Sequence, residues 1–162
     1  MKKKCLLPWI DKDTKILIVG TMPGEQSLQE QMYYANKNNK FWSYIEKILN
    51  QSQKLESSEE KKKLLQSYHI GLWDSLSVCE RTGSLDSQIT DEQYNDFSQY
   101  ESVKYIFFNG KKACKYFKKY NSEYLERRKY LELPSTSPAN ASIPDAKKFE
   151  QWKNALEPFI TK

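Results

Sequence analysis

Short apolar runs, separated by longer amphipathic segments, give this chain its pattern. Residues 16–19 (Ile-Leu-Ile-Val) show no alternation of polar and apolar positions, which is typical of a strand buried on both faces of a parallel sheet. Further short runs that read as strands lie at 70–74, 103–108 and 130–133. We therefore expect a central sheet of four mainly parallel strands.

Apolar residues recur at helical spacing between these runs. One such segment follows a cluster of asparagines, and its apolar positions are Phe41, Trp42, Ile45, Ile48 and Leu49. Ser57 and Glu60 stand in capping-box register before a second helix that reaches Tyr68. Alternating strands and helices predict a three-layer α/β/α domain with a small, mainly parallel four-stranded sheet.

Two further helices complete this pattern. The first begins after Gly110, with one face formed by Ala113, Phe117 and Tyr120 and another by Lys111, Lys115 and Lys118. The second opens at Pro144 and Asp145, with Phe149, Trp152 and Leu156 facing inward. The polar segment 77–100 contains Gly83 and several Ser and Asp residues, so we expect a loop there with at most one short helix.

Length and composition limit the class of protein. A chain of 162 residues suits one domain, which we expect to span 1–162. The net charge of +5 favours an acidic partner such as nucleic acid, and an aromatic content of 14% suits either base stacking or a filled core. The three cysteines show no close pairing, so we expect neither a disulfide framework nor a thiolate metal site.

His69 is the only histidine, which excludes multi-histidine metal sites and means that any histidine-based catalysis would depend on this one residue. It precedes an apolar run, so we interpret it as structural. The basic start at residues 2–4 is followed by an apolar stretch too short for a signal peptide, and no segment approaches the length of a membrane span. We expect a cytoplasmic protein without membrane contact.

The strand at 16–19 ends in a Gly-Thr-Met-Pro-Gly turn at 20–24. In parallel sheets ligands bind at the carboxyl ends of strands, and glycines there let the backbone approach a ligand closely. This turn lacks the spacer and the Gly-Lys-Ser/Thr of a phosphate loop. Polar amides among aromatics follow at 33–42, a pattern that favours a pocket for a flat heterocycle, although an ordinary strand-to-helix turn would also fit the turn itself.

Five segments in register resemble the uracil-DNA glycosylase superfamily, and within it the hypoxanthine-DNA glycosylase branch. They span nearly the whole chain and comprise 20–24 (GTMPG), 34–42 (YANKNNKFW), 71–74 (GLWD), 107–110 (FFNG) and 133–140 (LPSTSPAN). The resemblance implies that a damaged nucleotide is flipped from duplex DNA and that water cleaves its N-glycosidic bond, without metal or cofactor. The same pattern implies a monomer acting on DNA with a deaminated base.

The resemblance also implies site residues, and one departure matters. Many superfamily members orient the water with Asp or Asn at the position of Met22, whose thioether cannot orient water well. In the hypoxanthine branch this role passes to an asparagine that matches Asn39, whose amide oxygen can accept a hydrogen bond from water. The alternative is that Asn39 only caps the helix beginning at Lys40.

Base recognition follows from the same likeness. Tyr34 matches the aromatic residue that stacks on the flipped base, although an ordinary core or rim tyrosine is the alternative. Asp74 stands where uracil-specific members read the base with Asn. A carboxylate could accept the N1 proton of hypoxanthine and repel the N1 lone pair of adenine, whereas a capping or loop aspartate would explain Asp74 equally well. The turn residues expected to line the base site are Gly20, Thr21, Met22, Pro23 and Gly24.

The segment 135–140 matches the superfamily loop that grips the DNA backbone beside the flipped nucleotide. Its expected DNA-binding residues are Ser135, Thr136, Ser137, Pro138, Ala139 and Asn140. Ser137 stands where other members have His, so we expect backbone amides of the 20–24 turn to stabilise the leaving base instead. We interpret Lys111, Lys112 and Lys115 as a solvated helix face rather than DNA contacts.

The sequence thus predicts a glycosylase acting on deoxyinosine. Two alternatives stay open at this point. The first is a uracil or mismatch glycosylase of the same fold, and the second is a catalytically silent nucleic-acid-binding module, because a fold does not fix a function.

Overall fold

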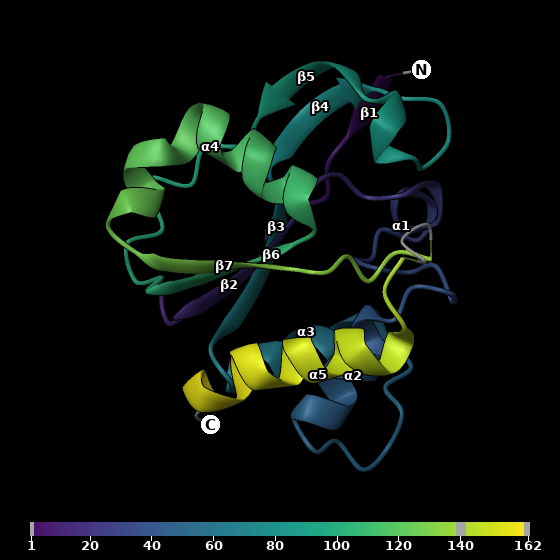
Figure 1. Ribbon diagram of the computed structural model, residues 1–162, viewed down its shortest axis with the longest axis vertical. Coiled ribbons are helices and arrows are strands. Elements are labelled where there is room, and N and C mark those ends of the chain that lie inside the picture. The colour runs from purple at the N-terminus through teal and green to yellow at the C-terminus, as the bar shows by residue number, and fades with distance from the viewer. Residues whose placement is uncertain (1, 139–141, 161–162) are drawn as a thin grey trace.

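A four-stranded parallel sheet forms the centre of the computed structural model, which describes residues 2–138 and 142–160 (Figure 1). The strand order is β3-β2-β6-β7, and the strands are β2 (Ile16–Gly20), β3 (Ile70–Asp74), β6 (Tyr105–Asn109) and β7 (Lys129–Leu133). Strand β2 pairs in parallel with both β3 and β6, and all of its residues are buried. The predicted four-stranded sheet is confirmed.

Helices cover both faces of this sheet. On one side lie α2 (Phe41–Ile48), α3 (Ser58–Ser67) and α5 (Asp145–Leu156), and on the other lies α4 (Lys111–Glu126) (Figure 1). Successive residues of β2 point to opposite faces. Ile16 and Ile18 pack in the core of the first side, while Leu17 and Val19 pack in the core beneath α4. The three-layer α/β/α architecture is confirmed.

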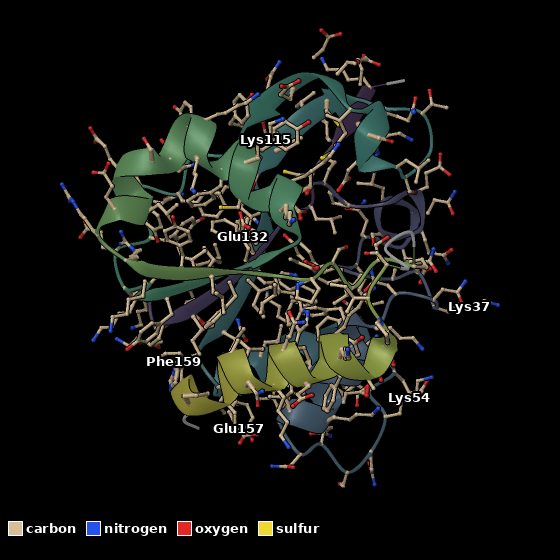
Figure 2. The ribbon with its side chains drawn as sticks, viewed as in Figure 1. Lys37, Lys54, Lys115, Glu132, Glu157 and Phe159 are labelled. Carbon is tan, nitrogen blue, oxygen red and sulfur yellow. The ribbon has the colours of Figure 1, made fainter. Side chains whose placement is uncertain are left out.

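The helix ends follow the expected sequence signals. The capping box is formed, since Ser57 Oγ accepts the N–H of Glu60 and the Glu60 carboxylate accepts the N–H of Ser57. Pro144 precedes the first residue of α5. After α5, the turn η2 (Glu157–Phe159) returns to the sheet, where the Phe159 ring lies 4.2 Å from the Tyr105 ring, centroid to centroid (Figure 2).

Tyr120 does not share the buried face of α4 with Ala113 and Phe117, as the helical spacing had suggested. The Tyr120 side chain is 57% exposed and stacks on the Tyr94 ring at the surface. The backbone of α4 departs from helical geometry at Asn121, where φ is −113°, and the Asn121 side chain is the buried one. Asn121, four residues after Phe117, takes the next position on the buried face instead of Tyr120.

The segment 77–100, expected to be a loop with a short helix, instead supplies two strands of a second sheet. Strands β4 (Leu76–Glu80) and β5 (Thr90–Tyr94) pair antiparallel, with the short helix η1 (Asp86–Gln88) between them. Strand β1 (Lys2–Lys4) adds to β4 from the N-terminus. These strands are not evident from the sequence because most of their side chains are exposed or half-buried, so they lack an apolar pattern. Strand β1 is also distant from β4 in the sequence.

The short helix α1 (Glu25–Glu30) follows the 20–24 turn, as the strand-to-helix interpretation of that turn allows. It lies at the edge of the central sheet where β2, β3, β6 and β7 all end (Figure 1). Since parallel strands end at one edge, the loops that follow them meet there. This edge contains the candidate site.

Candidate active site

A cavity of about 810 Å³ opens at the carboxyl ends of the central strands. Residues that follow β2 and β7, together with Asp74 at the end of β3, line this cavity. The expected site residues that line it are Gly20, Thr21, Met22, Pro23, Gly24, Tyr34, Asn39, Asp74, Ser135, Thr136, Ser137 and Pro138. Ala139 and Asn140 lie outside the described residues.

Gly20 makes room for two functional side chains at the end of β2. It pairs in register with Asp74 of β3. A Cβ atom at position 20 would lie 2.5 Å from Asp74 Oδ1 and 3.0 Å from the Tyr34 hydroxyl oxygen. The absence of a side chain therefore lets the Asp74 carboxyl and the Tyr34 hydroxyl both reach the same point at the cavity.

The Asp74 carboxyl is buried without a partner for one of its oxygens. Only 3% of the residue is exposed, and Oδ2 accepts or donates no hydrogen bond within the described residues. Burial raises the pKa of this carboxyl to about 7, the nearby charge of Asp86 adds to the rise, and Arg81 opposes it. A buried carboxyl oxygen without a partner is costly, and Asp74 lines the cavity, so a ligand that donates a hydrogen bond to this carboxyl would be favoured.

Tyr34 borders the same cavity with one face of its ring already occupied. The ring stacks on Phe41 of α2, with centroids 4.1 Å apart and planes 27° apart. Burial raises the pKa of the phenol well above its usual range, so the hydroxyl stays neutral. A base can stack only on the ring face opposite Phe41.

Asn39 lies between the start of α2 and the cavity. Its Oδ1 accepts the N–H of Phe41, the first residue of α2, at 2.9 Å, which is a capping interaction. The residue is half-buried and lines the cavity. Because a carbonyl oxygen has two lone pairs, the capping bond leaves one acceptor site on Oδ1 for a water molecule.

Met22 has no polar group that could orient a water molecule, as expected. It is 7% exposed and packs with Leu76, Cys79, Ile89 and Tyr116 against the second sheet. The position that carries a polar side chain in many superfamily members is therefore part of an apolar cluster.

The loop after β7 is held in place from three directions. Thr136 exchanges two hydrogen bonds with the Asn109 side chain, and its carbonyl accepts the N–H of Lys40 at 3.1 Å. Trp152 of α5 donates from Nε1 to the Pro134 carbonyl at 2.9 Å. Sequence reasoning gave Asn109 no role, although its position at the end of a predicted strand is the signal that could have indicated one.

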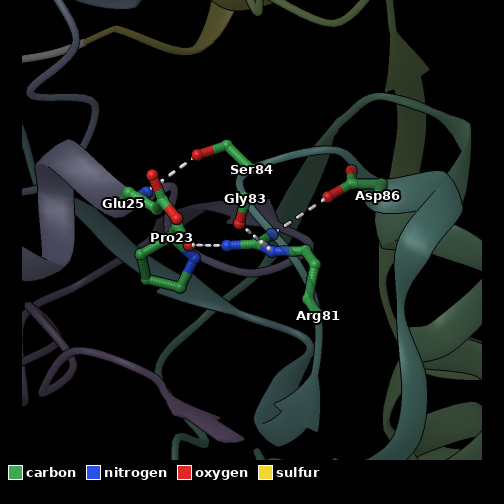
Figure 3. A network of polar contacts seen from close by, with 6 residues as sticks. All are labelled: Pro23, Glu25, Arg81, Gly83, Ser84 and Asp86. Carbon is green, nitrogen blue, oxygen red and sulfur yellow. Dashed lines mark hydrogen bonds and ion pairs between the residues drawn. The ribbon is translucent and has the colours of Figure 1, made fainter. Parts of the chain in front are cut away.

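The sequence analysis assigned no role to Arg81. This fully buried residue lies at the end of the second sheet, just past β4, and its guanidinium donates to the Pro23 carbonyl, to the Gly83 carbonyl at 3.1 Å and to Asp86 Oδ1 at 3.4 Å (Figure 3). Nearby, Ser84 Oγ accepts the N–H of Glu25 at 2.9 Å. Sequence reasoning could not find this contact because the segment was taken for an ordinary polar loop.

Lysines border the cavity on the side of α4. Lys111 and Lys112 are exposed in the first turn of that helix and also line the cavity, so they are closer to a bound ligand than expected. Lys115, one turn later, is exposed but is not among the lining residues (Figure 2). Their charge favours an anionic ligand at this edge.

Within residues 2–138 and 142–160, no group of three or more His, Cys, Asp or Glu side chains could hold a metal ion. No helix in the same residues is both long and apolar enough to cross a membrane.

Comparison with known proteins agrees with this geometry. Two curated relatives are named hypoxanthine DNA glycosylase. One, from Methanosarcina acetivorans, is 38% identical over 81% of this chain and 84% of its own length, and one from Methanosarcina barkeri is 35% identical over 72% and 76%. A solution NMR structure of a candidate uracil DNA glycosylase from Methanosarcina acetivorans superposes with a TM-score of 0.83 at 32% identity, covering 98% of this chain and 99% of the other.

The family comparison covers nearly the whole fold. The model of the uracil DNA glycosylase superfamily matches residues 7–159, a range that contains the central sheet, the loops at its carboxyl edge and every described residue that lines the cavity. The chain therefore belongs to the uracil DNA glycosylase superfamily.

Proposed function

We propose that this protein is a DNA glycosylase that removes hypoxanthine from deoxyinosine and leaves an abasic site. Water attacks C1′ of the sugar, the C1′–N9 bond breaks, and its electron pair leaves with the base. The two relatives named hypoxanthine DNA glycosylase support this substrate. The protein would act as a monomer on duplex DNA from which the deaminated base has been flipped.

The observation that carries the proposal is the unpartnered oxygen of Asp74 in the cavity wall. Hypoxanthine presents an N1–H donor, which an ionised carboxylate accepts, whereas adenine presents a lone pair at N1. Tyr34 lines the cavity, and its ring face opposite Phe41 would stack on the same base. Both groups meet at Gly20, so a single bound base can contact them together.

Asn39 would hold the attacking water. Its remaining Oδ1 lone pair accepts a hydrogen bond from water, while the bond to Phe41 fixes the direction of the side chain. An amide cannot take a proton at neutral pH, so its contribution is position rather than basicity. The proton released by the water passes to solvent.

The loop at 135–138 would contact the DNA backbone. Its fixation by Asn109, Lys40 and Trp152 lowers the entropy lost when DNA binds. Lys111 and Lys112 would add a salt-dependent attraction for phosphates. Ser137 cannot supply a cationic ring, so stabilisation of the leaving base falls to backbone amides of the 20–24 turn.

The test is incubation of the purified protein, with chelator present, against labelled duplexes that contain one inosine, uracil, xanthine or only normal bases. Alkali then cuts the abasic sites. Cleavage at inosine that Asn39→Ala removes and the exposed neighbour Asn38→Ala retains would support the proposal. Cleavage at uracil alone would favour a uracil glycosylase, and DNA binding without any base release would indicate a binding module.

A further inference from the structure

We propose that Arg81 is a positioning residue for base removal: its guanidinium fixes the Pro23–Gly24 peptide so that the Gly24 N–H is presented to the leaving base. This inference rests on the proposed function, because it assigns a task within the same site. It concerns a residue that contacts neither the substrate nor the reacting atoms.

The contacts of Arg81 join two cavity walls that are far apart in sequence. One wall is the 20–24 turn, reached through the Pro23 carbonyl. The other wall is the segment 84–86, which Arg81 contacts through the Asp86 carboxylate and through the carbonyl of the preceding residue, Gly83 (Figure 3). The bond from the Glu25 N–H to Ser84 Oγ and a hydrogen bond between Thr21 and Asp86 join the same two walls again. The turn is thus held on both sides of Pro23.

Peptide geometry links this clamp to the cavity. The Pro23–Gly24 peptide is trans, so its C=O and N–H groups point in opposite directions. Because the carbonyl points at Arg81, the Gly24 N–H points away from Arg81. Within the described residues this N–H has no hydrogen-bond partner, whereas the next N–H, of Glu25, is taken by Ser84. Gly24 lines the cavity, so its N–H is a donor of this turn that a bound base could use.

A free, fixed donor is what the leaving base requires. When the C1′–N9 bond breaks, negative charge spreads over the purine ring, and a backbone N–H held in place can stabilise that charge without reorganising. The backbone of Gly24 lies close to the opposite wall, since a Cβ there would be 3.2 Å from Ser84 Oγ. A small rotation of the peptide would turn the donor away, and Arg81 opposes that rotation.

Two pairs of variants test the idea by single-turnover excision of inosine. Arg81→Gln removes the cationic clamp, and Arg128→Gln is the control, because Arg128 also donates to backbone carbonyls, of Val103 at 2.8 Å and Tyr124 at 2.9 Å, outside the cavity lining. Gly24→Pro deletes the N–H itself, and the Gly24 φ of −72° suits proline. Gly24→Ala keeps the N–H and measures the cost of the added Cβ.

We expect the excision rate of Gly24→Pro to fall roughly a hundred- to thousandfold, as for loss of one transition-state donor, and that of Arg81→Gln to fall by up to the same factor. Binding of DNA with an uncleavable abasic analogue should stay within about twofold in both, since the DNA-gripping loop is unchanged. Arg81→Lys should recover part of the rate. Arg128→Gln should lose thermal stability only.

Equal rates for Arg81→Gln and Arg128→Gln, or for Gly24→Pro and Gly24→Ala, would overturn the positioning role. If the wild-type protein released no base, the proposed function would fail separately. Binding of free hypoxanthine, measured by thermal shift, would then decide the inference. Weaker binding by Arg81→Gln than by Arg128→Gln would support it, and equal binding would contradict it.

Discussion

Asn109 and Thr136 exchange two hydrogen bonds across the carboxyl edge of the sheet. Asn109 Nδ2 donates to Thr136 Oγ1 at 2.9 Å, and the Thr136 N–H donates to Asn109 Oδ1 at 3.0 Å. Both residues are buried. This pairing ties the loop at 134–138 to the end of β6 and so fixes one wall of the cavity.

Replacement of Asn109 should therefore affect both stability and excision. Asn109→Ala leaves the buried Thr136 N–H unpaired, at a cost of about 1–3 kcal/mol in the free energy of unfolding. We expect excision of inosine to fall roughly tenfold or more because the loop loses its fixed position. Asn121→Ala is the control, since Asn121 also bridges two backbone groups, of Phe97 and Asn95, outside the cavity lining. Equal excision losses in the two variants would contradict this role for Asn109.

The two roles of Asn39 can be separated by substitution. Asn39→Ala loses the cap on Phe41, which costs about 1 kcal/mol, and loses the water-holding oxygen, so excision should stop. Asn39→Asp keeps an acceptor for both partners and should retain excision. Denaturant unfolding and single-turnover assays on both variants give the comparison. Undiminished turnover by Asn39→Ala would remove Asn39 from the mechanism.

The Asp74 carboxyl should make stability depend on pH. Its pKa is about 7 in the folded protein and near 3.8 when unfolded, so the folded state retains a proton that the unfolded state has lost between these values. The free energy of unfolding should therefore fall as pH rises from about 4 to 7, by on the order of 1–4 kcal/mol from this group. Asp74→Asn should flatten the slope and melt above the wild type at pH 8. Parallel pH profiles would refute the assignment.

Asp74→Asn should also change which base is removed. An amide presents a donor as well as an acceptor, which suits the uracil edge better than a carboxylate does. We expect the ratio of inosine to uracil excision to fall. The ratio of single-turnover rates on matched duplexes measures this directly, and an unaltered ratio would mean that the base edge is read elsewhere.

Gly20 should tolerate no side chain. In Gly20→Ala the new Cβ would displace the Asp74 carboxyl and the Tyr34 hydroxyl, because it would lie 2.5 Å and 3.0 Å from their oxygens. We expect excision to drop roughly a hundredfold, by analogy with other misplaced catalytic groups, while abasic-product DNA still binds. Fluorescence anisotropy with product DNA, beside the excision assay, tests both parts. Retained excision would show that the cavity can rearrange around the methyl group.

Several elements follow from local signals alone. The unbroken apolar run of β2, the Ser57–Glu60 capping box and the proline before α5 each depend on neighbours within a few residues, so they were predicted correctly. The family motifs indicated most of the cavity lining for the same reason, since each motif is contiguous in sequence.

The second sheet and the clamp at Arg81 could not be predicted in this way. Strand β1 pairs with β4, which lies more than seventy residues later in the sequence, and no pattern within either strand indicates that pairing. Arg81 resembles a surface residue in a polar segment, yet it is buried, with acceptors from its own segment (Gly83 and Asp86) and from the distant 20–24 turn (Pro23) around it.

The sequence by itself determined the central sheet, the order of its helices and the motifs at the sheet edge, because hydrophobic periodicity and capping act locally. Only the tertiary structure decided that Asp74 is buried without a partner, that Asn39 caps and lines the cavity at once, and that Asn109 and Arg81 hold the loops. Burial, charge and hydrogen bonding at those residues depend on segments brought together by folding, and a linear pattern does not contain that information.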